Sequence, residues 1–179
     1  MSVVLGDLTQ RIESAVFLDT SFIIDSIFRA AGPHPAASEL LTQLAMGRME
    51  GRIRLCVSTR VIDELLWASR TILLERDRGV RSWGRLTARE ASEAWLRYSE
   101  EIAHLGRLLL SPDAPWEVLG VTAEDAGMAV GVIETHGLQP ADAFHYAVCQ
   151  RACESCIITN DRHFRALPEL NCIRYDVDL

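Results

Sequence analysis

Four carboxylates are candidates for a shared metal site because each lies near the end of a run predicted to be a strand: Asp19, Glu64, Asp142 and Asp161. Asp19 directly follows the apolar run 15–18, and Asp161 directly follows the run 156–160. In open α/β sheets ligands bind at the carboxyl ends of the strands, where residues far apart in the sequence come together. We therefore expect one acidic site assembled from the whole fold.

Glu64 and Asp142 are expected to reach this site from helices. Glu64 lies little more than one helical turn beyond the apolar run 53–57, and Asp142 opens a predicted helix that leads into the run 156–160. Four carboxylates would repel one another unless protons or divalent cations neutralised them. An acid-rich set without a focused group of His or Cys residues suits Mg²⁺ or Mn²⁺ better than zinc.

Such a site predicts hydrolysis without a protein nucleophile, because a bound cation lowers the pKa of a water and neutralises a phosphodiester in the transition state. A second cation can stabilise the leaving oxygen. Asp19 and Asp161 are the preferred direct ligands, whereas Glu64 and Asp142 complete the site directly or through water. Four neighbouring polar residues are predicted to orient the acids or their waters: Thr20, Ser21, Thr159 and Asn160.

Strands and helices are predicted to alternate along the chain. The predicted strands are 15–19, 53–57, 117–120, 156–160 and 171–175. The predicted helices are 21–30, 36–49, 59–75, 87–110, 122–136 and 140–152, with a helical turn at 163–165. This order predicts right-handed crossovers and a parallel sheet covered on both faces, in one α/β domain that spans residues 1–179.

Composition excludes several other mechanisms. All 18 basic residues are arginine, so mechanisms that need a lysine, such as P-loop phosphate binding and Schiff-base chemistry, are excluded. No apolar stretch is long enough to span a bilayer, and no secretory signal begins the chain, so we expect a cytoplasmic protein without a membrane partner. The five cysteines are an odd number in such a chain, which predicts buried reduced thiols.

Four segments resemble the motifs of one family: 17–25 (FLDTSFIID), 58–65 (STRVIDEL), 138–147 (LQPADAFHYA) and 158–164 (ITNDRHF). Each motif alone has little specificity. All four in this order, at spacings that suit a single domain, are similar to the PIN-domain family, which includes the VapC-type ribonuclease toxins. The resemblance extends from Val16 to Tyr175.

The resemblance implies a five-stranded parallel sheet between helices, in which the four acids hold one or two Mg²⁺ or Mn²⁺ ions. It implies a metal-dependent endoribonuclease that hydrolyses RNA phosphodiester bonds, and the toxin of a toxin–antitoxin pair. The implied partners are RNA and a small antitoxin protein, with a second copy of the chain as a further candidate. The stretch from about 76 to 115 looks longer than in compact toxin members, so we expect a helical extension there.

Arginines clearly outnumber acids between Arg70 and Arg89, where six arginines accompany two acids, although the chain has a net charge of −7. Because affinity for phosphate comes largely from neutralising it, this stretch is a candidate RNA contact, through Arg78, Arg81 and Arg85. A solvated helix face is the more common origin of such a cluster and remains the alternative, as does a surface for an acidic partner segment.

Polar residues near the four acids have simpler interpretations. Asp25 and Asp63 are expected to face solvent or to make local hydrogen bonds. His145, three residues after Asp142, is interpreted as a packed or hydrogen-bonded side chain rather than a ligand. His163 is interpreted as a surface turn residue, with contact to RNA as the alternative.

Three further hypotheses are weighed against a nuclease. A PIN fold that binds RNA or protein without turnover stays open, and cleavage with added Mn²⁺ discriminates it. An Asp-based phosphotransfer fold is disfavoured, because a receiver domain needs a lysine and a dehalogenase-like phosphatase needs an aspartate where Ser21 stands. The spacing Cys149-x3-Cys153-x2-Cys156 resembles an iron–sulfur motif, but these thiols are predicted to fill the interface between a helix and a strand.

Overall fold

The core of the fold is a sheet of five parallel strands in the order β3-β2-β1-β4-β5. The strands are β1 (Ala15–Leu18), β2 (Arg54–Ser58), β3 (Glu117–Leu119), β4 (Cys156–Ile158) and β5 (Asn171–Ile173). Every residue of β1 and β4 is buried, as expected for parallel strands covered on both faces. The computed structural model describes residues 14–28, 33–79, 83–167 and 169–175, and it confirms the predicted α/β class and the five-stranded parallel sheet.

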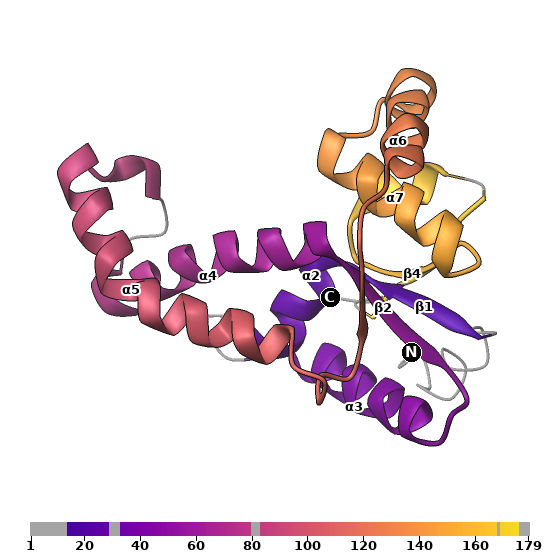
Figure 1. Cartoon of the computed structure of the whole chain (residues 1–179), viewed down its shortest axis with the longest axis horizontal. Coiled ribbons are helices and arrows are strands. Elements are labelled where there is room, and N and C mark those ends of the chain that lie inside the picture. The colour runs from indigo at the N-terminus through magenta and orange to yellow at the C-terminus, as the bar shows by residue number, and fades with distance from the viewer. Residues whose placement is uncertain (1–13, 29–32, 80–82, 168, 176–179) are drawn as a thin grey trace.

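Helices cover both faces of this sheet. They are α2 (Thr20–Ile23), the π-helix η1 (Ile24–Phe28), α3 (Pro35–Met49), α4 (Thr59–Arg78), α5 (Ala88–Leu109), α6 (Ala123–His136) and α7 (Pro140–Ala152), with 3₁₀ turns η2 (Trp83–Arg85) and η3 (Arg162–Ala166). Figure 1 shows α6 and α7 on one side of the sheet and α3 on the other. Helix α7 packs against β1, β2 and β4, which fixes the position of its first turn over the sheet.

Several predicted boundaries shift by a few residues. The predicted strand 15–19 ends at Leu18, because Asp19 is the N-cap of α2. The predicted helix 21–30 is divided into α2 and η1, since its hydrogen bonds change to the π register. The predicted helix 59–75 continues to Arg78 and ends at Gly79, whose φ of 65° favours glycine.

The order of the strands in the sheet determines where the predicted acidic site lies, between β1 and β4. From β1 the chain crosses to β2 and then β3 on one side, whereas β4 and β5 lie on the other side of β1. The crevice between the carboxyl ends of β1 and β4 is therefore the topological switch point, where open α/β sheets bind ligands. Leu18 and Ile158 are paired in the register, so the residues that follow them are neighbours.

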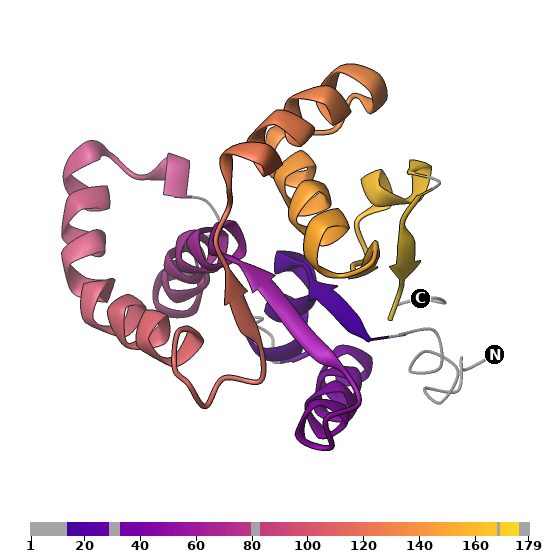
Figure 2. The ribbon, with the colours of Figure 1, turned by 45° about the vertical axis from the view of Figure 1, so that its right-hand side comes forward.

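The C-terminal half of α4 and helix α5 form a hairpin, here called the arm, that extends away from the sheet (Figures 1 and 2). A small apolar cluster separate from the main core joins the two helices: Leu74, Ala94, Tyr98 and Ile102. Thr87 and Glu90 form a capping box at the start of α5. The arm contains most of the predicted extension 76–115. Within the described ranges, no helix combines the length and the apolar character needed to cross a bilayer.

Candidate functional site

Asp19 lies buried at the end of β1, with 5% of its surface exposed, and its carboxylate is fully oriented by hydrogen bonds. The backbone N–H of Thr20 donates to Oδ1 at 2.8 Å. The hydroxyls of Ser21 and Thr159 donate to Oδ2 at 2.6 and 2.7 Å. Thr159 follows β4, so the pairing of β1 with β4 supplies one of these donors directly. A carboxylate held in this way stays in one rotamer, as a ligand or a catalytic group requires.

Glu64 faces the same crevice from the second turn of α4. The Thr20 hydroxyl donates to Glu64 Oε2 at 2.6 Å, and Arg60, one turn earlier on α4, forms an ion pair with Oε1 at 3.2 Å. Nε2 of His145 lies 2.9 Å from the same Oε2 atom. Since a carboxylate only accepts, Nε2 is the protonated nitrogen in this hydrogen bond.

Opposite charges hold Glu64 and His145 together against the effect of burial. Burial alone raises the pKa of Glu64, but the hydrogen bond and charge of His145, with help from Thr20 and Arg60, bring it below its ordinary value. Burial lowers the pKa of His145, but the hydrogen bond to Glu64 and the negative charges of Asp19, Glu64 and Asp142 raise it above its ordinary value. The imidazole Nε2 is also 3.9 Å from Asp19 Oδ1, so this buried histidine links two of the acids.

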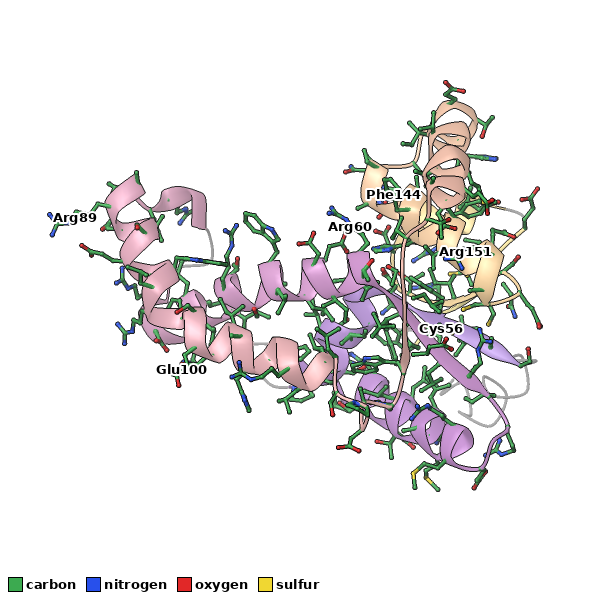
Figure 3. All side chains as sticks on the ribbon, in the orientation of Figure 1. Cys56, Arg60, Arg89, Glu100, Phe144 and Arg151 are labelled. Atoms are coloured by element: carbon green, nitrogen blue, oxygen red, sulfur yellow. The ribbon has the colours of Figure 1, made fainter. Side chains whose placement is uncertain are left out.

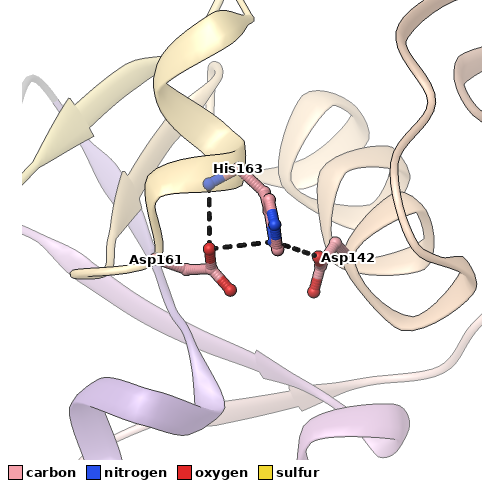
Figure 4. A group of neighbouring side chains, drawn as sticks. All are labelled: Asp142, Asp161 and His163. Atoms are coloured by element: carbon pink, nitrogen blue, oxygen red, sulfur yellow. Dashed lines mark hydrogen bonds and ion pairs between the residues drawn. The ribbon is translucent and has the colours of Figure 1, made fainter.

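A second group of side chains completes the crevice from α7 and η3: Asp142, Asp161 and His163 (Figure 4). Nδ1 of His163 lies 3.1 Å from Asp161 Oδ1 and 3.3 Å from Asp142 Oδ2. Asp161 is also the N-cap of η3 and accepts from the His163 backbone N–H at 2.8 Å. One potential ligand atom from each of the three residues lies within 4.8 Å of the others.

The pKa of Asp142 is raised by its surroundings in this crevice. Burial raises the pKa of Asp142, and the negative charges of Asp161 and Asp19 raise it further, outweighing the opposite effects of His145 and His163. The two groups of acids therefore influence one another electrostatically, although each group is held by its own hydrogen bonds and ion pairs. Elevated proton affinity in a cluster of acids marks a place where a cation would be stabilised.

The donor set fits a hard divalent cation. Asp142 and Asp161 supply carboxylate oxygens, with His163 as an exposed imidazole beside them, and the buried Glu64 Oε1 atom accepts no hydrogen bond, although it forms an ion pair with Arg60. Mg²⁺ and Mn²⁺ prefer such oxygen ligands. Asp19 lies on the other side of the crevice, close enough for its charge to raise the pKa of Asp142.

The remaining polar residues of the motifs have different surroundings. Oδ1 of Asn160 is buried and has no hydrogen-bond partner among the described residues. Asp63 makes the expected local contact, since Arg60 donates to it at 2.8 Å. Asp25 instead accepts a hydrogen bond from the Tyr175 hydroxyl at 2.6 Å, so the expectation of solvent exposure or a local bond was wrong.

The sequence interpretation missed two contributions to the site. His163 is 45% exposed, as a turn residue would be, yet its ring lies between two of the acids. Its position two residues after Asp161, in the first turn of a helix, was the available signal. Arg60 was also missed, although its spacing of four residues from Glu64 is that of a helical ion pair. His145 is buried and hydrogen-bonded, as interpreted, and also lies within the acidic crevice.

An open pocket of about 480 Å³ lies beside the acids, between the first turns of α4 and α7. Seven residues line it: Thr59, Arg60, Asp63, Val121, Pro140, Ala141 and Phe144. Figure 3 labels two of these residues, Arg60 on α4 and Phe144 on α7. The pocket and the crevice share Arg60, which forms ion pairs with Asp63 and Glu64.

The arginine-rich stretch lies along the arm, away from the acids. Arg78 and Arg85 are exposed, whereas Arg81 lies outside the described residues. Arg78 is 14 residues after Glu64 on the same helix, which corresponds to about 21 Å. Arg76 and Arg89 form ion pairs within the arm, with Glu101 and Glu93. The arm could therefore contact a ligand only at a distance from the acids.

The cysteines take no part in the acidic crevice. All five are free thiols, and four of them are buried: Cys56, Cys149, Cys153 and Cys156. The Cys149 thiol donates to the backbone carbonyl of Cys156 at 3.3 Å, across the interface between α7 and β4. These residues pack the core as predicted.

Comparisons with known proteins agree with this architecture. Three solved structures cover 89–90% of this chain and 97–98% of their own: VapBC2 from Rickettsia felis bound to a DNA fragment from its promoter (12% identity, TM-score 0.50), a toxin–antitoxin complex from Klebsiella pneumoniae (15%, 0.51) and FitAcB from Neisseria gonorrhoeae (15%, 0.51). At these identities the similarity concerns the fold. No curated protein matches the chain significantly. The PIN domain model matches residues 16–170, which confirms the resemblance of the four motifs, and the chain belongs to the PIN domain family.

Proposed function

We propose that this PIN-domain chain is a Mg²⁺- or Mn²⁺-dependent endoribonuclease that hydrolyses RNA phosphodiester bonds. The observation that carries the proposal is the convergence of four carboxylates at the switch point between β1 and β4, where burial and the charges of Asp161 and Asp19 raise the pKa of Asp142. Members of the PIN domain family are generally nucleases, and this acid-rich set suits a hard cation.

Asp19, Glu64, Asp142 and Asp161 would hold the cation, which supplies an activated water and neutralises charge on the phosphate when bound. The hydroxyls of Ser21 and Thr159 fix the Asp19 carboxylate, and that of Thr20 orients Glu64. We assign Asn160 a supporting role for waters in the same crevice, since its buried Oδ1 is free to accept.

We further propose that the chain is the toxin of a toxin–antitoxin pair in the cytoplasm, with a small antitoxin protein as its partner and a homodimer as its assembly. The support is that one of the similar structures is described as a toxin–antitoxin complex, and another as VapBC2 bound to a DNA fragment from its promoter. An antitoxin partner predicts that expression of the chain alone arrests growth. Growth arrest that persists with Asp19→Asn would contradict this assignment.

A catalytically silent module that binds RNA or protein is the second candidate. The observation in its favour is that Glu64 is already neutralised inside the protein, by Arg60 and by the buried His145. A site whose acids are paired internally needs a cation less than a site of free acids does.

Incubation of the purified chain with single-stranded RNA distinguishes the two candidates. A nuclease cuts the RNA with Mn²⁺, leaves 5′-phosphate and 3′-hydroxyl ends, and stops on addition of EDTA. Asp161→Asn should abolish cleavage with little effect on the fold, because Asp161 is one-third exposed, whereas the exposed control Asp113→Asn should cut normally. Cleavage that continues in EDTA or in Asp161→Asn would contradict the metal mechanism, and no cleavage by the parent protein would favour the silent module.

A further inference from the structure

We infer that the pocket between α4 and α7 binds one unstacked nucleobase of a single-stranded RNA, beside the phosphate held at the acids. Phe144 is the stacking surface, and Asp63 accepts a hydrogen bond from an exocyclic amino group of the base. The inference rests on the proposed ribonuclease function and adds to it a positioning site for the substrate.

The lining of the pocket has the character of a ligand site. One part of the wall is apolar and comes from α7 and the connection before α6: Val121, Pro140, Ala141 and Phe144. The facing wall is polar and comes from the first turns of α4: Thr59, Arg60 and Asp63. Predominantly apolar pockets with a few convergent polar groups are the usual form of small-molecule sites. A nucleobase has apolar faces and a polar edge, and this two-sided lining matches both.

The pocket is part of the same structural unit as the acids. Ala141 and Phe144 each directly precede a residue of the acidic crevice, Asp142 and His145, on the same two turns of α7. On the opposite wall, the Arg60 guanidinium is 2.8 Å from Asp63 Oδ2 and 3.2 Å from Glu64 Oε1. A nucleotide whose base enters the pocket therefore has its backbone next to the four acids.

An aromatic side chain and a carboxylate favour a base over an apolar side chain of a protein partner. Sequence-specific recognition of RNA generally uses unstacked bases that stack on aromatic rings and bond through their edges. Asp and Glu accept hydrogen bonds from the amino group of cytosine, whereas a purely apolar occupant would leave Asp63 without a new partner. The 480 Å³ of the pocket holds a base of either size.

The orientation of Asp63 also predicts a preference among bases. Its carboxylate accepts and cannot donate, so bases with an exocyclic amino group should bind better than uracil, which has none. Arg60 holds one carboxylate oxygen, Oδ2, in place. The amide of Asp63→Asn can donate, so this variant should reduce or reverse the preference.

Binding of a short single-stranded RNA that carries one 2-aminopurine tests the stacking surface, because the fluorescence of this base falls when it stacks. The full-length chain is used with Mg²⁺ and with Asp161→Asn as background, so that the probe is not cut. We expect Phe144→Leu to weaken binding about tenfold, or about 1.4 kcal/mol, and to abolish the quenching. Phe144→Tyr, which keeps the ring, should bind within about twofold of the parent.

Two further variants keep the test independent of folding. Phe28→Leu makes the same substitution at a partly buried residue of η1 outside the pocket, and it should leave binding unchanged. Asp63 has a side chain that is 52% exposed, so Asp63→Asn should fold normally. The affinity of the parent for oligo(C) over oligo(U) should fall in Asp63→Asn.

The outcomes separate this inference from the nuclease proposal. Loss of quenching in Phe144→Leu but not in Phe28→Leu, with a changed base preference in Asp63→Asn, supports the base site. Equal affinity of the Phe144→Leu and parent proteins overturns it and leaves the pocket to an apolar side chain of a protein partner, even if the parent cuts RNA. Binding that depends on Phe144 in a chain that cuts no RNA supports the base site while the nuclease proposal fails.

Discussion

The imidazole Nε2 of His145 lies 2.9 Å from Oε2 of Glu64, inside the crevice where the acids converge. The histidine is 1% exposed, so its proton is shielded from solvent. Its positive form neutralises Glu64 and the nearby Asp19 from within the protein, as a bound cation would from outside. His145 and a metal ion are therefore expected to compete for the same negative charge.

Replacing His145 with Gln tests this competition. Loss of the buried ion pair should destabilise the metal-free protein by about 1–3 kcal/mol, and for a chain of this size each kcal/mol lowers Tm by about 2–4 °C. The rise in Tm on adding Mn²⁺ should be larger than in the parent, since no imidazolium opposes the cation. Differential scanning calorimetry with and without Mn²⁺ measures both changes, and the exposed His104→Gln is the control. Equal increments in His145→Gln and the parent would show that the two cations do not compete.

Asp142→Asn should change stability in opposite directions with and without metal. Because burial and the charges of Asp161 and Asp19 raise the pKa of Asp142, its removal relieves repulsion and should raise Tm in EDTA. The parent should gain about 2.7 kcal/mol at a Mn²⁺ concentration a hundred times Kd, and Asp142→Asn should gain less. Thermal melts over a series of Mn²⁺ concentrations give both values. A parent whose melting curve is unchanged by saturating Mn²⁺ would rule out a metal site in the crevice.

The arm should contribute to RNA binding only through its exposed arginines. Replacing Arg78 and Arg85 by Ala, alone or together with Arg81, should weaken binding and lower the salt dependence, by about 0.7 in the slope of log K against log salt for each phosphate that is no longer neutralised. Metal affinity should not change, since Arg78 lies about 21 Å along α4 from Glu64. Fluorescence anisotropy over a salt series provides the measurement. The control is the pair Arg48→Ala and Arg52→Ala, at the end of α3 and in the turn that follows it. An unchanged affinity and slope would reduce the cluster to a solvated helix face.

The ion pair between Asp125 and Arg151 lies away from the crevice. It predicts that the folded state loses stability at acidic pH. Arg151 donates to both oxygens of the buried Asp125 at 2.8 and 2.9 Å. Burial raises the pKa of Asp125, but Arg151 and the Thr122 cap outweigh it, so the pKa lies below its ordinary value of 3.8. A carboxyl whose pKa is lower in the folded state stabilises the fold above its unfolded pKa, and this contribution disappears as the pH falls through the folded value.

Asp125→Asn should therefore cost about 1–3 kcal/mol at neutral pH, and the difference from the parent should shrink as the pH falls below about 3.8. Urea unfolding between pH 7 and pH 3 measures this difference. The exposed Asp113→Asn controls for the loss of one charge. A deficit in Asp125→Asn that stays constant with pH would assign the effect to packing instead of charge.

The succession of strands and helices along the chain and the positions of Asp19 and Asp161 were predictable, because strand ends and caps depend on neighbouring residues. Asp19 ends β1 by capping the next helix, which is a local signal. The hydrogen bond between Asp25 and Tyr175 joins residues 150 positions apart, and no local pattern predicts it. The same holds for His163, whose ring reaches Asp142 only because α7 packs over the sheet.

The division of the predicted helix 21–30 into α2 and η1 has a different origin. Apolar periodicity shows that a helix is present, but over five residues it does not distinguish the α from the π hydrogen-bond register. Ser26 is buried in η1, and its hydroxyl donates to the carbonyls of Phe22 and Ala37. The bond to Ala37 depends on the position of α3, so this segment depends in part on tertiary structure.

Helix α4 is one continuous element of 20 residues, about 30 Å long, with Glu64 in its second turn and the apolar contacts of the arm near its other end. A helix of this length without a break is expected to move as one rigid element. A partner that displaces its distal end would therefore also change the orientation of the Glu64 carboxylate near its start. We therefore expect a partner that binds α5 to change the angle at which Glu64 faces Thr20 and His145.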